Sequence, residues 1–122
     1  MVAEPVRGPR VAVVGVCGSG KSTVVDHLRR VHVDAYAVAQ EHSVVRDLWN
    51  HLQPDRVVYL QASLETVRLR RGPGWPDWIY ELQRERLADA RAHAAVTVDT
   101  GESDVEQTVR RIVTAIGLDE DA

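Results

Sequence analysis

The stretch that most constrains this chain is GVCGSGKST, residues 15–23, which directly follows the apolar run RVAVV. That run is short, β-branched and continuously apolar, which is typical of a strand buried on both faces of a parallel sheet. Apolar residues at helical spacing follow the glycines, namely Val24, Val25, Leu28 and Val31. The sequence therefore predicts a buried strand, a glycine-rich turn and an amphipathic helix, in that order.

Within this turn the spacing is Gly15-x-x-x-x-Gly20-Lys21-Ser22, the pattern of a phosphate-binding loop. Its glycines let the backbone curl so that N–H groups point at phosphate oxygens, and the helix N-terminus adds partial positive charge. Lys21 is the only lysine in a chain with 14 arginines, and a compact ammonium reaches the β- and γ-phosphates better than a planar guanidinium. Ser22 is expected to offer its hydroxyl to Mg²⁺. The residues expected to bind the nucleotide, ATP, are Gly15, Val16, Cys17, Gly18, Ser19, Gly20, Lys21, Ser22 and Thr23.

Three more apolar runs, at 33–39, 56–62 and 95–100, are expected to be strands of the same sheet. The strands are expected to alternate with helices, and two glycines and two prolines make 71–78 a loop. The predicted helix starts are Ser43, Ser63, Asp77 and a capping box of Ser103 with Glu106; the helix from Asp77 runs to about His93, and Gly117 ends the last one. This alternation predicts an α/β protein, with a three-layer α/β/α fold around a parallel sheet of about four strands.

Length and composition bound the organisation of the chain. Its 122 residues fit one domain, expected at 10–117, between a loose arm at 1–9 and an acidic tail at 118–122. The net charge of −3 gives no general attraction to nucleic acid or anionic lipid, so neither is an expected partner. Cys17 is the only cysteine, which excludes an intramolecular disulfide and fits a reducing cytosol. No apolar run approaches the roughly 18 residues that span a bilayer, and we expect a cytoplasmic protein.

The segment PDRVVYLQASLETVRLRR, residues 54–71, resembles the strand, helix and lid start of P-loop small-molecule kinases, the shikimate kinase and nucleoside monophosphate kinase group. The shared features are the pair Pro54 and Asp55, an apolar strand ending at Leu60, and an arginine ten residues later, Arg70. The likeness covers most of residues 10–117. In that group a mobile lid closes over the transferring phosphoryl group and brings arginines to its charge. The resemblance therefore implies a P-loop NTPase fold with a short lid, and Arg70, followed by Arg71, as the catalytic arginines.

Other side chains near the expected lid are weaker candidates. Arg68, Arg84 and Arg86 also flank the loop, but runs of charge usually face water. Trp75 and Trp78 lie within it and could cover a substrate, although large aromatic residues more often anchor a loop on the core.

Phosphoryl transfer also needs an acid that holds Mg²⁺ through water or takes a proton from the acceptor. Several kinases of this kind have Asp after the strand-end leucine, but this chain has Gln61, and an amide cannot bind metal as an anion. The better candidate is Glu41 in AQEHS, residues 39–43, at the sheet edge where doubly wound folds place their sites. We predict Glu41 as metal ligand or base, with Gln40 and His42 gripping the acceptor. The alternative is that Glu41 and His42 are ordinary polar residues ahead of a helix cap.

Two functions fit these observations. One is an enzyme, a kinase that transfers the γ-phosphoryl group of ATP to a small metabolite or nucleotide. The other is a regulatory nucleotide-binding module that transfers nothing or hydrolyses ATP slowly, which Gln61 and a short acceptor region favour. The short region implies an acceptor pocket that is small or shared with a second copy, so a homodimer is among the expected partners. A guanine-reading NKxD motif is absent, which argues against a GTPase switch.

Overall fold

Within residues 8–117, which the computed structural model describes, four strands form one parallel sheet. They are β1 (Arg10–Gly15), β2 (Asp34–Ala37), β3 (Arg56–Gln61) and β4 (Val96–Asp99), in the order β2-β1-β3-β4. In the pairing register Val13 lies beside Ala37 and Val58, so β1 is the strand between β2 and β3. Residues 1–7 of the predicted arm and the predicted tail at 118–122 lie outside the described residues.

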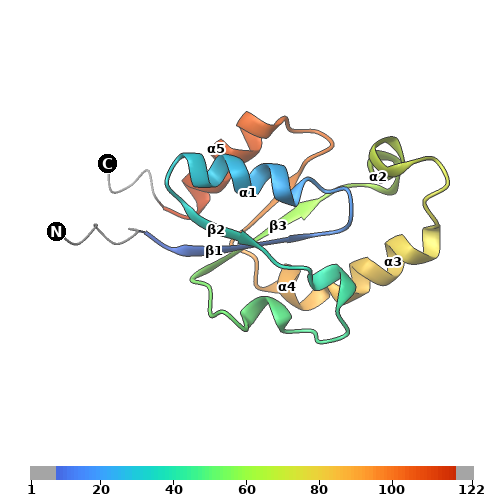
Figure 1. Cartoon of the computed structure of the whole chain (residues 1–122), viewed down its shortest axis with the longest axis horizontal. Helices are drawn as coiled ribbons and strands as arrows, with labels where there is room; N and C mark the ends of the chain where they lie inside the picture. Colours follow the sequence, from blue (N-terminus) through green and yellow to red (C-terminus); the bar gives the residue numbers. More distant parts are fainter. Residues whose placement is uncertain (1–7, 118–122) are drawn as a thin grey trace.

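Helices cover both faces of this sheet, as the sequence predicts. They are α1 (Lys21–Arg30), α2 (Leu64–Arg71), α3 (Asp77–Arg86), α4 (Ala88–Ala92) and α5 (Val105–Ala115). Figure 1 shows α1 and α5 on one face, α3 and α4 on the other, and α2 beyond the carboxyl end of β3. The predicted three-layer α/β/α fold is therefore confirmed. None of the helices in the described part of the chain combines the length and apolar character that a bilayer crossing requires.

The central strands are apolar throughout because their alternating side chains enter two separate cores. Val13 packs with Leu28 in the core under α1 and α5, whereas Val14 packs with Leu87 in the core under α3 and α4. All four side chains are fully buried, and each such burial contributes about 1.5–3 kcal/mol. Val31, predicted for the apolar face of α1, is instead 51% exposed because it is the residue that ends that helix.

The helix predicted from Ser43 is wrong. Two short 3₁₀ turns, η1 (Gln40–His42) and η2 (Leu48–Asn50), replace it. The Gln40 side chain accepts from Trp49 N at 2.8 Å and donates to Val45 O at 2.7 Å, and Ser43 Oγ accepts from Val45 N at 3.0 Å. Such local side-chain bonds compete with helical ones. Val45 and Leu52, whose spacing would place them on the apolar face of such a helix, are 43% and 60% exposed.

The N-caps of α2 and α5 can be compared directly with the predicted ones. Ser63 caps α2 as predicted, with its Oγ accepting from Thr66 N at 3.1 Å. The capping box of α5 is formed by Asp104 and Gln107, one residue later than the predicted pair of Ser103 and Glu106. Both pairs satisfy the same local sequence pattern. The second pair forms because α5 begins at Val105, directly after Asp104.

The helix predicted from Asp77 to about His93 is interrupted. Pro76, and not Asp77, is the N-cap residue of α3. The helix is interrupted at Leu87, and α4 then ends at Ala92 with His93 as its C-cap residue. Gly117 ends α5 as predicted, with a φ of 85° that suits glycine.

Candidate functional site

The turn between β1 and α1 has the curled backbone that the glycine spacing predicts. Gly18 and Gly20 have φ values of 81° and 96°, in the left-handed region that glycine adopts at little cost. At Gly15 a Cβ would lie 2.4 Å from Ser19 Oγ and 2.6 Å from Leu60 O, so only glycine fits there without a shift. The sequence spacing thus corresponds to a steric need at each of these three glycines.

Helix α1 begins at Lys21 without a side-chain cap and without an acidic residue in its first turn. The N–H groups at its start therefore lack a side-chain partner and carry the partial positive charge of the helix end. Ser22 and Thr23 are exposed beside them. This end of α1 is suited to receive an anion.

Lys21 and Glu41 form an ion pair at the loop. Lys21 Nζ donates to Glu41 Oε2 at 2.6 Å, to Gly15 O at 2.7 Å and to Val16 O at 3.3 Å. The two side chains are 13% and 4% exposed, so the pair is largely removed from water. The structure therefore brings together the lysine and the acid that the sequence placed 20 residues apart.

The Glu41 carboxylate is only half satisfied. Within residues 8–117 its second oxygen, Oε1, is buried and has no hydrogen-bond partner. Burying an ionised oxygen without a partner costs free energy. A cation, a water or a proton-bearing group bound at this oxygen would therefore be stabilised. Arg86 contacts the same residue only through its backbone, with Nη1 3.5 Å from Glu41 O.

A groove of about 420 Å³ joins these groups. It lies between the loop, η1 and the end of α2. Three of the predicted nucleotide-binding residues, Gly15, Val16 and Ser19, are not among those that line it. The lining residues are Cys17, Gly18, Gly20, Lys21, Ser22, Thr23, Glu41, His42, Arg70 and Arg71. Val16 and Ser19 are 2% and 0% exposed, so these two loop residues are buried beneath the surface of the groove.

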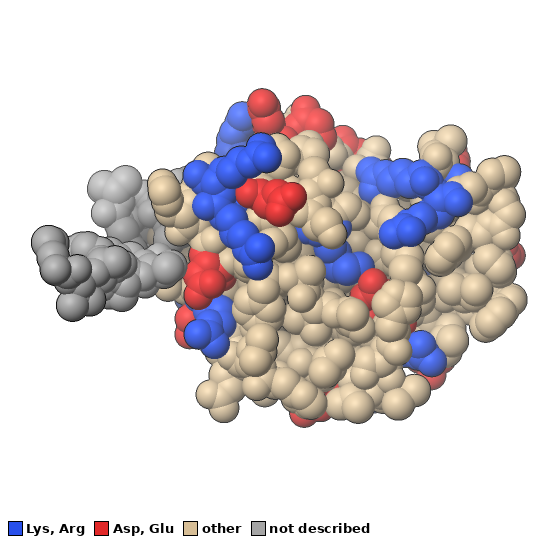
Figure 2. Space-filling model, in the orientation of Figure 1, with Lys and Arg blue, Asp and Glu red and all other residues tan. Residues whose placement is uncertain are grey.

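The arginines of α2 stand at the mouth of this groove, and Figure 2 shows basic side chains gathered over α2 at the right of the view. Arg70 is anchored: Nη1 donates to Gly18 O at 2.7 Å and Nη2 to Thr100 O at 2.7 Å. No hydrogen bond or ion pair holds Arg71 within the described chain, and its Cγ lies 3.2 Å from where a Cβ of Gly18 would be. Arg71 is therefore the freer of the two predicted cations.

A second cavity, of about 380 Å³, adjoins the loop on the α5 side. Gly20, Thr23 and Arg70 line both cavities, so the two share a border at the start of α1. Thr100 and Thr108 are among the residues on its far wall.

Two residues that the sequence reading missed hold the loop in place. Gln83 on α3 is 4% exposed; its Oε1 accepts from Cys17 N at 3.0 Å and its Nε2 lies 3.3 Å from Cys17 Sγ. Thr100, after β4, donates from Oγ1 to Ser19 O at 2.7 Å. These pairs are 66 and 81 residues apart, and no local pattern marks either partner.

Several predicted side chains have other tasks. Gln40 is fully buried with its amide bonded to the backbone, so it does not grip an acceptor. Trp75 packs against the core under α3 and α4, as a loop anchor would, whereas Trp78 is 68% exposed. Arg68 bonds to Trp75 O and pairs with Asp77, which ties the loop together.

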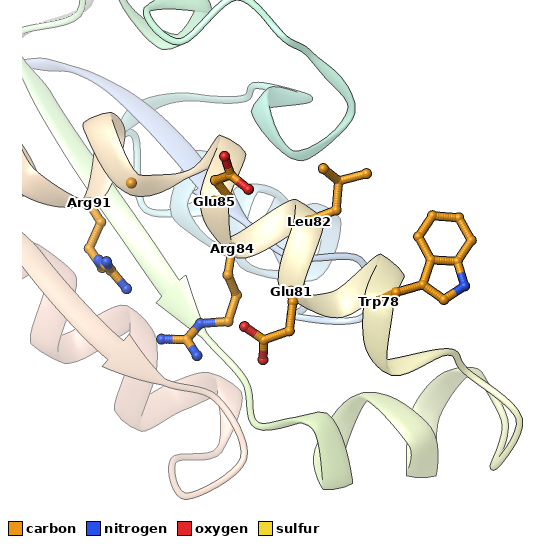
Figure 3. Close-up of a pocket in the computed structure, with 7 residues that line it drawn as sticks. Trp78, Glu81, Leu82, Arg84, Glu85 and Arg91 are labelled. Carbon is orange, nitrogen blue, oxygen red and sulfur yellow. The ribbon is translucent and has the colours of Figure 1, made fainter.

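A further cavity, larger than these two, lies elsewhere on the described part of the chain. It measures about 590 Å³ and runs along α3 and α4, where Figure 3 shows Arg84 and Arg91 on one side of α3 and Trp78 pointing away at its start. Burial raises the pKa of the nearby Tyr59, and the positive charges of Arg91 and Arg84 partly oppose that shift. No residue of the loop lines this cavity, so volume alone does not locate the site.

Comparison with known structures agrees with this fold. Shikimate kinase from Acinetobacter baumannii, solved in complex with shikimate, superposes with a TM-score of 0.62 at 17% sequence identity. The match covers 93% of this chain and 96% of that one. No family model and no curated protein matches the sequence. The chain has the fold of a P-loop kinase.

Proposed function

We propose that this protein is a kinase that transfers the γ-phosphoryl group of ATP to a small molecule. The observation that carries the proposal is the 2.6 Å pair of Lys21 and Glu41 at the bottom of a groove that the loop and two arginines line. A cation for the phosphates, an acid for the acceptor and charges for the transition state are the groups that this chemistry needs. The shikimate kinase fold supports the same conclusion.

The residues present fit a magnesium nucleotide. Gly20 leaves open space beside the loop, since a Cβ there would meet no described atom within 4 Å, and α1 begins uncapped. The loop amides, Lys21 and Thr23 would hold the phosphates, Ser22 and Glu41 the metal, and the 380 Å³ cavity has room for the nucleoside. When bound, ATP with Mg²⁺ supplies the phosphoryl group and offsets its charge.

The chain's own residues would then act as follows. Lys21 exchanges its bond to Glu41 for a phosphate oxygen, which frees the carboxylate. Glu41 would then accept the proton of the acceptor hydroxyl. Arg71, which no hydrogen bond or ion pair holds among residues 8–117, would neutralise charge on the transferring group. Arg70 would tie the loop at Gly18 to Thr100.

One observation favours a second function, a nucleotide-binding module without transfer. Gln61 is exposed at the end of β3, where an acid would be expected, and Arg70 already donates to the backbone of Gly18 and Thr100. Such a module would bind MgATP and phosphorylate no acceptor.

Titration calorimetry with MgATP tests the proposal. Lys21→Ala is expected to lower the affinity at least about 100-fold, because a charge-assisted phosphate bond contributes about 1.5–3 kcal/mol and the remaining Glu41 charge repels phosphate. Arg30→Ala, which removes an exposed cation from the other end of the same helix, is the matched control. Equal affinities in both variants would contradict the nucleotide site.

Transfer itself is measured with labelled ATP against a panel of small hydroxyl compounds. Shikimate comes first because the similar kinase was solved with it. Binding of MgATP together with no labelled product from any acceptor would favour the module.

A further inference from the structure

We propose that Cys17, Glu41 and His42 form a binding site for a thiophilic divalent metal ion, with zinc as the ion that fits best. One ligand atom of each residue lies within 4.8 Å of the other two. The three come from two segments, the phosphate-binding loop and η1, which the fold brings together at the groove. This site is distinct in chemistry from the magnesium of the proposed reaction.

The spacing of the ligand atoms is close to that of a tetrahedral zinc site. Cys17 Sγ lies 3.4 Å from His42 Nε2, and His42 Nε2 lies 3.7 Å from Glu41 Oε2. Zinc bonds of about 2.3 Å to sulfur and about 2.0–2.1 Å to nitrogen and oxygen put tetrahedral ligand atoms about 3.3–3.6 Å apart. Small side-chain shifts would therefore close the site around an ion, with a fourth position left for water.

The unsatisfied oxygen of Glu41 is an independent sign of a missing partner. Glu41 Oε2 is bonded to Lys21, whereas Oε1 is buried and has no hydrogen-bond partner among residues 8–117. The whole side chain is 4% exposed, so water does not satisfy this oxygen freely. An ion bound by both carboxylate oxygens would use Oε2, which lies 3.7 Å from His42 Nε2, and would also satisfy the buried Oε1.

The surroundings already orient the ligands. Gln83 Nε2 donates to Cys17 Sγ at 3.3 Å, a bond that strengthens if the sulfur becomes a thiolate. Cys17 is buried, but the His42 side chain is 59% exposed, which leaves a path for the ion to enter. Such outer contacts typically change metal affinity about 10–100-fold.

The donor set selects the ion. Thiolate and imidazole prefer zinc and similar ions, whereas magnesium prefers oxygen ligands and waters. On binding, the Cys17 thiol releases its proton to solvent, and the thiolate and carboxylate balance the two positive charges of the ion. No electron is transferred, and the His42 imidazole binds in its neutral form.

A consequence follows that rests on the proposed function. Zinc bound by Cys17, Glu41 and His42 would exclude magnesium from Glu41 and hold its carboxylate away from the acceptor hydroxyl. Zinc is therefore expected to inhibit phosphoryl transfer, and a chelator is expected to restore it.

Cobalt titration of the reduced full-length chain tests the site without reference to ATP. Because Cys17 is the only cysteine, a thiolate-to-cobalt charge-transfer band reports this residue alone. We expect that band together with the visible bands of four-coordinate cobalt, saturating at one ion per monomer and lost when zinc displaces cobalt. Cys17→Ser is expected to abolish the charge-transfer band, and His42→Ala to lower zinc affinity more than about 100-fold, since it removes a ligand itself.

His51→Ala is the matched control. His51 is also an exposed imidazole beside a carboxylate, 3.6 Å from Asp47, but its pair includes no thiol. Its removal is expected to leave the cobalt spectrum and the zinc affinity unchanged, and circular dichroism confirms that each variant is folded.

Three results would overturn the site: no charge-transfer band in the folded protein, a band from one ion bridging two chains, or unchanged zinc affinity in His42→Ala. Calorimetry with MgATP is run separately on the same protein. If the protein binds cobalt but not MgATP, the metal site stands and the proposed kinase function is contradicted. If it binds MgATP but not cobalt, only the metal site is contradicted.

Discussion

Lys21 and Glu41 depend on each other in this structure. A carboxylate that is 4% exposed needs a cation, and Lys21 supplies it while donating two further bonds to the loop backbone. An arginine would present a wider, planar group to the same space, and its fork does not match a single oxygen and two carbonyls. The pair is therefore also a competition, because a phosphate that binds Lys21 must take it from Glu41.

Glu41→Gln separates binding from transfer. The glutamine keeps the size of the side chain but cannot accept a proton, so transfer is expected to fall at least about 100-fold, the usual contribution of a general base. The affinity for MgATP is expected to stay within a few-fold or to rise, since the negative charge of Glu41 no longer competes with phosphate for Lys21. Single-turnover kinetics and calorimetry measure the two effects.

Thermal unfolding serves as the control, because an altered pair could also destabilise the fold. Equal losses of affinity and transfer in a folded variant would remove Glu41 from the proposed catalytic role.

The elements show where local patterns suffice and where they leave a choice. Both Ser103 and Asp104 are residues that commonly cap helices, and both are followed three residues later by a suitable partner. In the structure the Asp104 side chain accepts from Gln107 N at 2.8 Å, and Gln107 Oε1 accepts from Asp104 N at 2.9 Å. The cap that forms is the one from which α5 presents its apolar face to the sheet.

Asp104→Ala is expected to lower the free energy of unfolding by about 1 kcal/mol, the usual cost of losing an N-cap. Ser103→Ala is the control, with an expected change within about 0.5 kcal/mol because Ser103 does not cap the helix. Urea denaturation measures both, and a larger loss at Ser103 would mean that Ser103, and not Asp104, caps the helix.

At the scale of the whole molecule, the site lies at the carboxyl ends of the parallel strands. The loop follows β1, η1 follows β2 and Thr100 follows β4, so segments far apart in the chain meet at one edge of the sheet (Figure 1). Two cores, one on each face, pack against the strands that lead to that edge.

Two leucines with opposite surroundings measure this dependence on the core. Leu28→Ala is expected to cost about 2–5 kcal/mol, because the side chain is fully buried between α1 and the sheet. Leu69→Ala, on a leucine that is 82% exposed on α2, is expected to change stability by no more than about 0.5 kcal/mol. Chemical denaturation compares them, and similar losses would mean that Leu69 is covered in solution.

The sequence by itself determined the four strands, most of the helices and the curled loop, and it offered Glu41 as the acid beside that loop. These features depend on local chemistry: β-branched runs form buried strands, left-handed turns need glycine, and parallel strands end at a common edge. The predicted helix from Ser43 failed because the buried Gln40 amide takes Val45 O and Trp49 N, a competition that periodicity does not show. Only the tertiary structure decided that Gln83 and Thr100 hold the loop, that Arg70 is anchored while Arg71 is free, and that Cys17 lies beside His42. Those contacts join residues 25 to 81 positions apart, and such pairs form only when the whole chain packs.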